Sequence, residues 1–210
     1  CSKDNAVDCR QYGMMDGITE INPIFAKMMQ VDPDMIMLGG NSSLNMMFDT
    51  ISLFMTKSPV EGEKPWLEVK NRKFLCPAPG YDRHFGITEY FGFEMITIPM
   101  TSEGPDMDMV EKLVAEDDSI KGIWCVPKYS NPQGITYSDE TVKRFANLNP
   151  KAKDFRIFWD DAYCVHDVTE TPDKLISLMD ECKKTGKTHL PIIICSHTKI
   201  TFPGRGVARL

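Results

Sequence analysis

The stretch from Ile120 to Asp160 contains three segments: IKGIWCV (120–126), SDETVKRFAN (138–147) and RIFWD (156–160). The first and third are short apolar runs of the kind that form buried strands. The second is an amphipathic segment with a Ser-x-x-Thr start, which predicts a helix. A strand, a helix and a second strand in this order predict a βαβ unit with parallel strands.

The same alternation continues in both directions along the chain. The further segments expected as strands are 35–38, 73–76, 94–99 and 191–196, and those expected as helices are 43–55, 81–91, 106–115 and 173–185. Repeated βαβ units predict an α/β fold with a mainly parallel sheet sandwiched by helices. The Pro-, Glu- and Lys-rich residues 56–71 are expected to form a surface excursion. Ligands of such sheets bind outside the carboxyl ends of the strands.

Composition sets limits on the class of protein. The chain has 210 residues, enough for one domain with a sizeable core, and its net charge of −6 argues against a nucleic-acid-binding surface. No run approaches the roughly 18 apolar residues of a membrane span, and the start resembles no signal peptide. The seven scattered cysteines are interpreted as small buried hydrophobes in a reducing compartment, neither disulfides nor metal ligands. We therefore expect a cytoplasmic protein without a metal site.

Clusters of potential ligand-binding residues follow the ends of the expected strands. In GGNSSL (39–44), two glycines permit close backbone approach, and amides at a helix start with serine hydroxyls suit an anion. PAPGYDRH (77–84) offers an aromatic ring and a histidine, and YSNPQG (129–134) offers an asparagine held extended by its proline. Taken singly, these segments also fit an ordinary capping turn, a core-packed tyrosine and an Asn-Pro turn.

Two further clusters carry charge at strand ends. WDDAY (159–163) ends an apolar strand with Asp160, whose burial is costly without a positive partner. CSHTK (195–199) follows another strand with Lys199, which by itself would be an ordinary surface charge. At an edge shared with an anion cradle, an aromatic ring, an asparagine and an aspartate, Lys199 becomes a candidate for Schiff-base chemistry.

The five segments, in this order, closely resemble the cofactor site of the fold type I pyridoxal-phosphate (PLP) enzymes. Asn-Pro-x-Gly alone is modest evidence, but Asp-x-Ala-Tyr and Ser-x-x-Lys follow it at suitable intervals. The sequence is most similar to the MocR-like aspartate aminotransferases, a branch of class I, over essentially the whole chain. The resemblance implies that residues 1–210 are part of the large PLP-binding domain, with the start of that domain and the small domain missing.

The resemblance also implies a role for each matched residue. Lys199 would carry PLP as a Schiff base and act in catalysis with Asp160, which would pair with the pyridine nitrogen, and Tyr163. The other implied cofactor contacts are His84, which would support Asp160; Tyr81, which would stack on the ring; Asn131, which would join Tyr163 at the phenolic oxygen; Gly40, Asn41 and Ser42, which match the phosphate cradle; Ser196; and Arg205, which fits with a shortened loop. Within RQYG (10–13), Tyr12 would reach the phosphate of the neighbouring subunit, which implies a homodimer with shared sites.

These matches predict transamination between an amino acid and a 2-oxo acid, most simply aspartate with 2-oxoglutarate. Two alternatives stay open. The same site serves other PLP reactions, such as β-elimination or decarboxylation. Aminotransferase-like domains also act as effector sensors in transcription regulators, although this acidic chain shows no DNA-binding segment. The partners expected are small-molecule substrates and a second copy of the chain, and neither nucleic acid nor a membrane.

Overall fold

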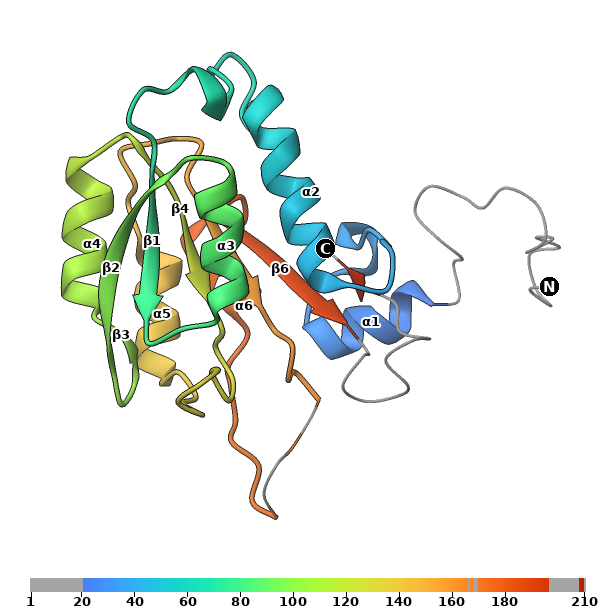
Figure 1. Cartoon of the computed structure of the whole chain (residues 1–210). Coiled ribbons are helices and arrows are strands. Elements are labelled where there is room, and N and C mark those ends of the chain that lie inside the picture. The colour runs from blue at the N-terminus through green and yellow to red at the C-terminus, as the bar shows by residue number, and fades with distance from the viewer. Residues whose placement is uncertain (1–20, 166, 168–169, 197–207, 210) are drawn as a thin grey trace, which may run out of the picture.

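A computed structural model describes residues 21–165, 167, 170–196 and 208–209 of the chain. Its centre is a sheet in the order β3-β2-β1-β4-β5-β6-β7 (Figure 1). The strands are β1 (Lys73–Ala78), β2 (Glu94–Thr101), β3 (Gly104–Pro105), β4 (Ile120–Cys125), β5 (Arg156–Asp160), β6 (Pro191–Ser196) and β7 (Ala208–Arg209). The five longer strands are parallel, and the short strands β3 and β7 pair antiparallel at the two edges. The predicted α/β fold with a mainly parallel sheet is confirmed.

Helices cover both faces of this sheet (Figure 1). The α-helices are α1 (Asn22–Met29), α2 (Ser43–Thr56), α3 (Asp82–Tyr90), α4 (Met107–Glu116), α5 (Asp139–Asn147) and α6 (Leu178–Thr185). Four begin at a side chain that accepts a hydrogen bond from a backbone amide in the first turn: Ser42 for α2, Asp106 for α4, Ser138 for α5 and Ser177 for α6. These caps satisfy amides that have no partner within the helix, which is why the chain turns into a helix at these polar residues.

Strand alternation divides the core into two clusters. Successive side chains of a strand point to opposite faces, so Ile157 and Trp159 of β5 join the cluster formed with α4, α5 and α6. Phe158 between them joins the cluster formed with α2 and α3. The same parity puts Asp160 on the α2–α3 face and Asp161 on the opposite face. Strand geometry thus separates two carboxylates that are adjacent in sequence.

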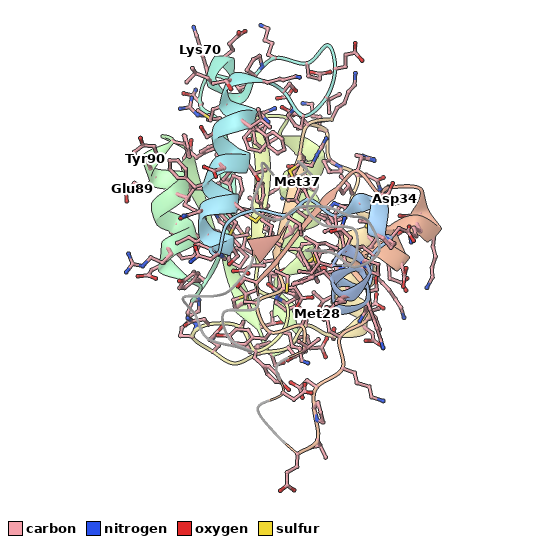
Figure 2. All side chains as sticks on the ribbon, turned by 90° about the vertical axis from the view of Figure 1, so that its right-hand side faces the viewer. Met28, Asp34, Met37, Lys70, Glu89 and Tyr90 are labelled. Atoms are coloured by element: carbon pink, nitrogen blue, oxygen red, sulfur yellow. The ribbon has the colours of Figure 1, made fainter. Side chains whose placement is uncertain are left out.

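The segment 35–38 was expected to be a strand, and this prediction is wrong. Pro33–Met35 forms a 3-10 turn, and only Leu38 makes a strand-like bridge. Proline fixes the backbone dihedral that opens such a turn, and too few residues then remain before Gly39 to pair along a strand. Ile36 is 5% exposed and packs with Phe25 and Ala26, whereas Met37, labelled in Figure 2, is 55% exposed, so the apolar run is buried only in part.

Two other segments also differ from the prediction. The helix expected from Asp173 begins only at Leu178, because Ser177 provides the cap while Asp173 bonds to a neighbouring loop. The expected surface excursion 56–71 contains a 3-10 turn, Trp66–Glu68, that places the Trp66 ring fully in the core. The other predicted helices and strands match the observed ranges to within two residues at each end, whereas α1, β3 and β7 were not predicted. Among the described residues, no helix is long and apolar enough to cross a membrane.

Candidate active site

The carboxyl ends of four neighbouring strands bring the predicted residues to one edge of the sheet. Strands β1, β4, β5 and β6 are adjacent and parallel, so the segments that follow them share that edge (Figure 1). Tyr81 follows β1, Asn131 follows β4, Asp160 ends β5 and Ser196 ends β6. The order of strands thus collects residues that are far apart in sequence, as the rule for open α/β sheets predicts.

Asp160 and His84 form the buried polar centre of this edge. The ring Nε2 of His84 lies 3.0 Å from Oδ2 of Asp160, and the two side chains are 1% and 8% exposed. A carboxylate only accepts, so Nε2 carries the hydrogen and donates it. The other oxygen, Asp160 Oδ1, is buried and has no hydrogen-bond partner among the described residues. An unsatisfied buried acceptor costs on the order of 1–3 kcal/mol, so this oxygen needs a donor from elsewhere.

Aromatic rings fix the orientation of His84. Trp124 of β4 stacks on the imidazole, with ring centroids 4.5 Å apart and an angle of 12°. Tyr81 meets its other side edge-on, at 5.0 Å and 84°. Tyr81, His84 and Trp124 line one narrow hollow together with Asn131, whose side chain is exposed. Trp124 was not among the predicted site residues, although its parity in β4 would have placed it on the face of Asp160.

At the start of α2, the backbone that was predicted to bind an anion is exposed. Gly40 and Asn41 are exposed, and no atom lies within 4 Å of the place where a side chain on Gly40 would begin. Gly39 is different, because Met46 already occupies the space beside it. The Ser42 hydroxyl accepts from the Asn45 amide at 3.3 Å, which leaves its own hydrogen available to an anion. Helix α2 contacts β6 and β7.

The opposite face of the same edge holds a second polar group, Asp161. This residue lines a cavity of about 570 Å³, and its Oδ1 atom is buried with no hydrogen-bond partner among the described residues. Burial and the neighbouring Asp160 carboxylate raise the pKa of Asp161 to about 7, against the lowering effect of Lys128. The Lys128 ammonium is buried and pairs with Asp167 at 2.9 Å. Lys128 was not among the residues that the sequence predicted for the site.

The loop after β4 lies against the turn that follows β5. Tyr129 has a left-handed backbone, with a φ of 49°, and its hydroxyl accepts from the Asp173 amide at 3.1 Å. Its ring lies 6.4 Å from that of Tyr163, which is half-buried. Tyr163 therefore sits in the turn directly beyond Asp160, at the predicted edge. Lys199, Arg205 and Tyr12 lie outside the described residues, so their predicted roles stay predictions.

Comparisons with known proteins identify the family. The model of the family described as "Aspartate amino-transferase" matches residues 2–210. The aspartate aminotransferase of Corynebacterium glutamicum is 42% identical over 204 residues, which are 97% of this chain and 47% of that protein. A crystal structure of an aspartate transaminase from the same species superposes with a TM-score of 0.92 at 41% identity, covering 98% of this chain and 48% of the other.

More distant structures share the fold. LysN, an α-aminoadipate aminotransferase of Thermus thermophilus solved with N-(5'-phosphopyridoxyl)-L-leucine, has a TM-score of 0.73 at 20% identity, covering 98% of this chain and 48% of that one. The chain spans about half the length of the curated relatives it matches. The family match nevertheless extends over nearly all of the present sequence. The chain belongs to the aspartate aminotransferase family.

Proposed function

We propose that this chain is the cofactor-binding part of a PLP-dependent aminotransferase that uses aspartate as amino donor and 2-oxoglutarate as acceptor. The MocR-like branch and the cytoplasmic location inferred from the sequence belong to the same proposal. The proposal rests on the hydrogen bonding of Asp160. One carboxylate oxygen accepts from His84, and the other is buried without a hydrogen-bond partner among the described residues.

The described residues fit PLP. The unpaired Asp160 Oδ1 is suited to accept from a protonated pyridine nitrogen, which satisfies the buried charge. The open backbone at Gly40, the Ser42 hydroxyl and the amino end of α2 are suited to a phosphate. Tyr81 presents an aromatic ring beside His84, the residue that holds Asp160. Acceptor, aromatic ring and anion cradle are the three groups that a planar phosphorylated pyridine requires.

PLP, when bound, provides the electron sink that stabilises negative charge at the substrate α-carbon. Asp160 keeps the ring nitrogen protonated, and His84 holds the carboxylate in place. Tyr163 and Asn131 donate hydrogen bonds to the phenolic oxygen. The amine of Lys199 would remove the proton from the substrate α-carbon as a general base and return a proton as a general acid.

The proposed dimer would complete this site. Tyr12 would cross an isologous interface to the neighbouring phosphate, and each subunit would return the same contact to the other. Exposed apolar side chains near the amino-terminal part of the structure favour such an interface: Ile24 is 58%, Met35 46% and Met37 55% exposed. Figure 2 shows Met37 together with Met28 and Asp34 on this side of the molecule.

Steady-state assays of the intact protein test the proposal. With PLP bound, we expect oxaloacetate and glutamate to appear in equal amounts from aspartate and 2-oxoglutarate, and little product from alanine or tyrosine as donor. Borohydride reduction followed by peptide mapping should place the cofactor on Lys199, with the buried Lys128 as the unlabelled control. Carbon dioxide with alanine or β-alanine from aspartate, without glutamate, would instead indicate decarboxylation, and release of pyruvate and ammonia from serine would indicate β-elimination.

A further inference from the structure

Two cysteines form a pair that the proposed reaction does not use. Cys195 is the last-but-one residue of β6 and is fully buried, and Cys164 lies in the turn after β5. Their sulfur atoms are 3.2 Å apart. The turn is fixed at that spot, because the Asp161 amide donates to the Ile194 carbonyl at 2.8 Å and the Cys164 amide to the Asp161 carbonyl at 3.3 Å. The close approach of the two sulfurs therefore rests on backbone contacts.

The two thiols differ in access. Cys164 is half-buried and lines the 570 Å³ cavity, so a small solute reaches its sulfur. The hydrogen bond to Cys164 and burial both hold the pKa of Cys195 far above its ordinary range. Cys195 thus keeps its proton, and either sulfur can be the donor in the contact between them. Cys164 is the sulfur placed to react first, and Cys195 lies behind it.

The other described cysteines provide an internal contrast. Burial raises the pKa of Cys76 to about 12 and that of Cys182 to about 11, and it keeps the pKa of Cys125 well above its ordinary value. Within the described part of the chain, none of these three thiols has a hydrogen bond to the sulfur of another cysteine. They match the expectation of small buried hydrophobes, and so does Cys195, whereas Cys164 is half-buried.

We propose that Cys164 and Cys195 form an oxidation site that a small hydroperoxide converts into a disulfide. In the first step the Cys164 sulfur attacks hydrogen peroxide, so that an S–O bond forms and the O–O bond breaks. The thiol proton leaves with the departing hydroxide as water. In the second step the Cys195 sulfur attacks the Cys164 sulfur, the S–S bond forms and the S–O bond breaks. The hydroxide released takes the Cys195 proton, so two thiols are oxidised and one peroxide is reduced to two waters.

The disulfide would disturb the candidate active site, an effect that rests on the proposed function. A disulfide needs a sulfur–sulfur distance of about 2.05 Å, so the two segments must approach by roughly 1 Å. Cys164 directly follows Tyr163, and Cys195 directly precedes Ser196 in the segment leading to Lys199. Oxidation would therefore shift residues proposed to hold PLP, and displacements of about 1 Å at a catalytic site cost up to about a hundredfold in rate.

The experiment treats the reduced holoprotein with hydrogen peroxide, quenches free thiols and maps the peptides without reduction. We expect a Cys164–Cys195 linkage that a dithiol reductant reverses. The Cys182→Ser variant should form the same linkage at the same rate, and in Cys164→Ser the Cys195 thiol should stay reduced. In Cys195→Ala, a sulfenic acid trapped by dimedone should appear on Cys164.

Two results would overturn the oxidation site: Cys164 and Cys195 both remain thiols while other cysteines oxidise, or Cys195 oxidises equally fast in Cys164→Ser. Cofactor absorbance and aspartate turnover, measured on the same samples, test the effect on the site. We expect both to fall at least tenfold with the linkage, to recover on reduction, and to be unaffected by peroxide in Cys164→Ser. A protein that forms the linkage but never transaminates contradicts the proposed function and leaves the oxidation site standing.

Discussion

At the scale of single residues, the most informative feature is the difference in surroundings between Asp160 and Asp161. The two carboxylates are neighbours in sequence and lie on opposite faces of the sheet. Asp160 is oriented by His84, whereas Asp161 lines the large cavity. Strand geometry alone therefore gives these two adjacent carboxylates different surroundings.

Asp160→Asn should therefore reduce turnover far more than Asp161→Asn. The amide keeps the shape of the side chain but removes the charge that holds a proton on the pyridine nitrogen. We expect kcat to fall by roughly 10²–10⁴-fold, the range of acid–base contributions, and Asp161→Asn to lower it by less than about tenfold. Cofactor binding should be confirmed in both variants by absorbance. Near-normal turnover in loaded Asp160→Asn would contradict the assigned role.

Asp161 also predicts a pH dependence of stability. Its pKa is about 7 in the folded protein and 3.8 in the ordinary state, so between these values the folded chain keeps a proton that the unfolded chain releases. Stability falls as pH rises through this window, by about 1.4 kcal/mol per pH unit, and the loss is complete above pH 7. The charged groups that shift the pKa of Asp161 are Asp160, which raises it, and Lys128, which lowers it.

Urea unfolding between pH 2 and 8 measures this effect. Asp161→Asn should flatten the decline and be more stable than the parent protein at pH 8. Asp117→Asn is a control of opposite sign. The hydrogen bonds from Lys73 and Ser119 outweigh burial and lower the pKa of Asp117 to about 2, so its contribution is lost as pH falls below about 4. An unchanged slope in Asp161→Asn would show that this carboxyl does not titrate in the window.

At the scale of helices and strands, a buried ion pair joins β4 to the turn before β5. Lys121 Nζ lies 2.7 Å from Asp154 Oδ1, and the side chains are 7% and 4% exposed. Removing one partner leaves a buried charge unpaired, so Lys121→Met should cost about 3–5 kcal/mol of the free energy of unfolding. The double variant Lys121→Met/Asp154→Leu should regain most of that loss.

Denaturant unfolding of the single and double variants checks this coupling. The exposed pair of Lys153 with Glu63, at 3.3 Å, provides a matched control. Lys153→Met should change stability by less than about 1 kcal/mol, because water already solvates both charges. If the double variant is no more stable than Lys121→Met, the two side chains are not energetically coupled.

The elements also show what sequence alone can predict. Alternating apolar and amphipathic segments sufficed for the α/β fold, and the rule on strand ends sufficed to bring Tyr81, Asn131 and Asp160 together. The strand predicted at 35–38 is wrong because the 3-10 turn that begins at Pro33 leaves only Leu38 to make a strand-like bridge, although Ile36 is buried. The Cys164–Cys195 contact joins residues 31 positions apart, and only the path of a turn decides it.

At the scale of the whole molecule, the proposed shared site makes a prediction about mixed subunits. Tyr12→Ala and Lys199→Ala should each be inactive, because one lacks a phosphate donor and the other the catalytic amine. After subunit exchange, half of the sites in a mixed dimer lack both residues and the other half have both intact. Partial activity should therefore return, and turnover of the mixture measures it.

Two controls accompany this mixing experiment. Each variant must be shown to dimerise, and a mixture of Lys199→Ala with Asp160→Asn should restore nothing, because both residues come from the same subunit. A silent mixture of Tyr12→Ala and Lys199→Ala, with dimers of both present, would mean that Tyr12 does not serve the neighbouring site.

The packing of α2 has a consequence for how the chain is made. Met47 and Ile51 of α2 lie in one apolar cluster with Ile194 of β6, the last long strand. A ribosome adds roughly 5–20 residues per second, so α2 emerges on the order of ten seconds before its partner strand exists. During that interval the apolar face of α2 must be covered by chaperones or by other parts of the growing chain. Under the proposed function, the start of α2 would therefore be held in its folded position to bind an anionic cofactor only after β6 has been made.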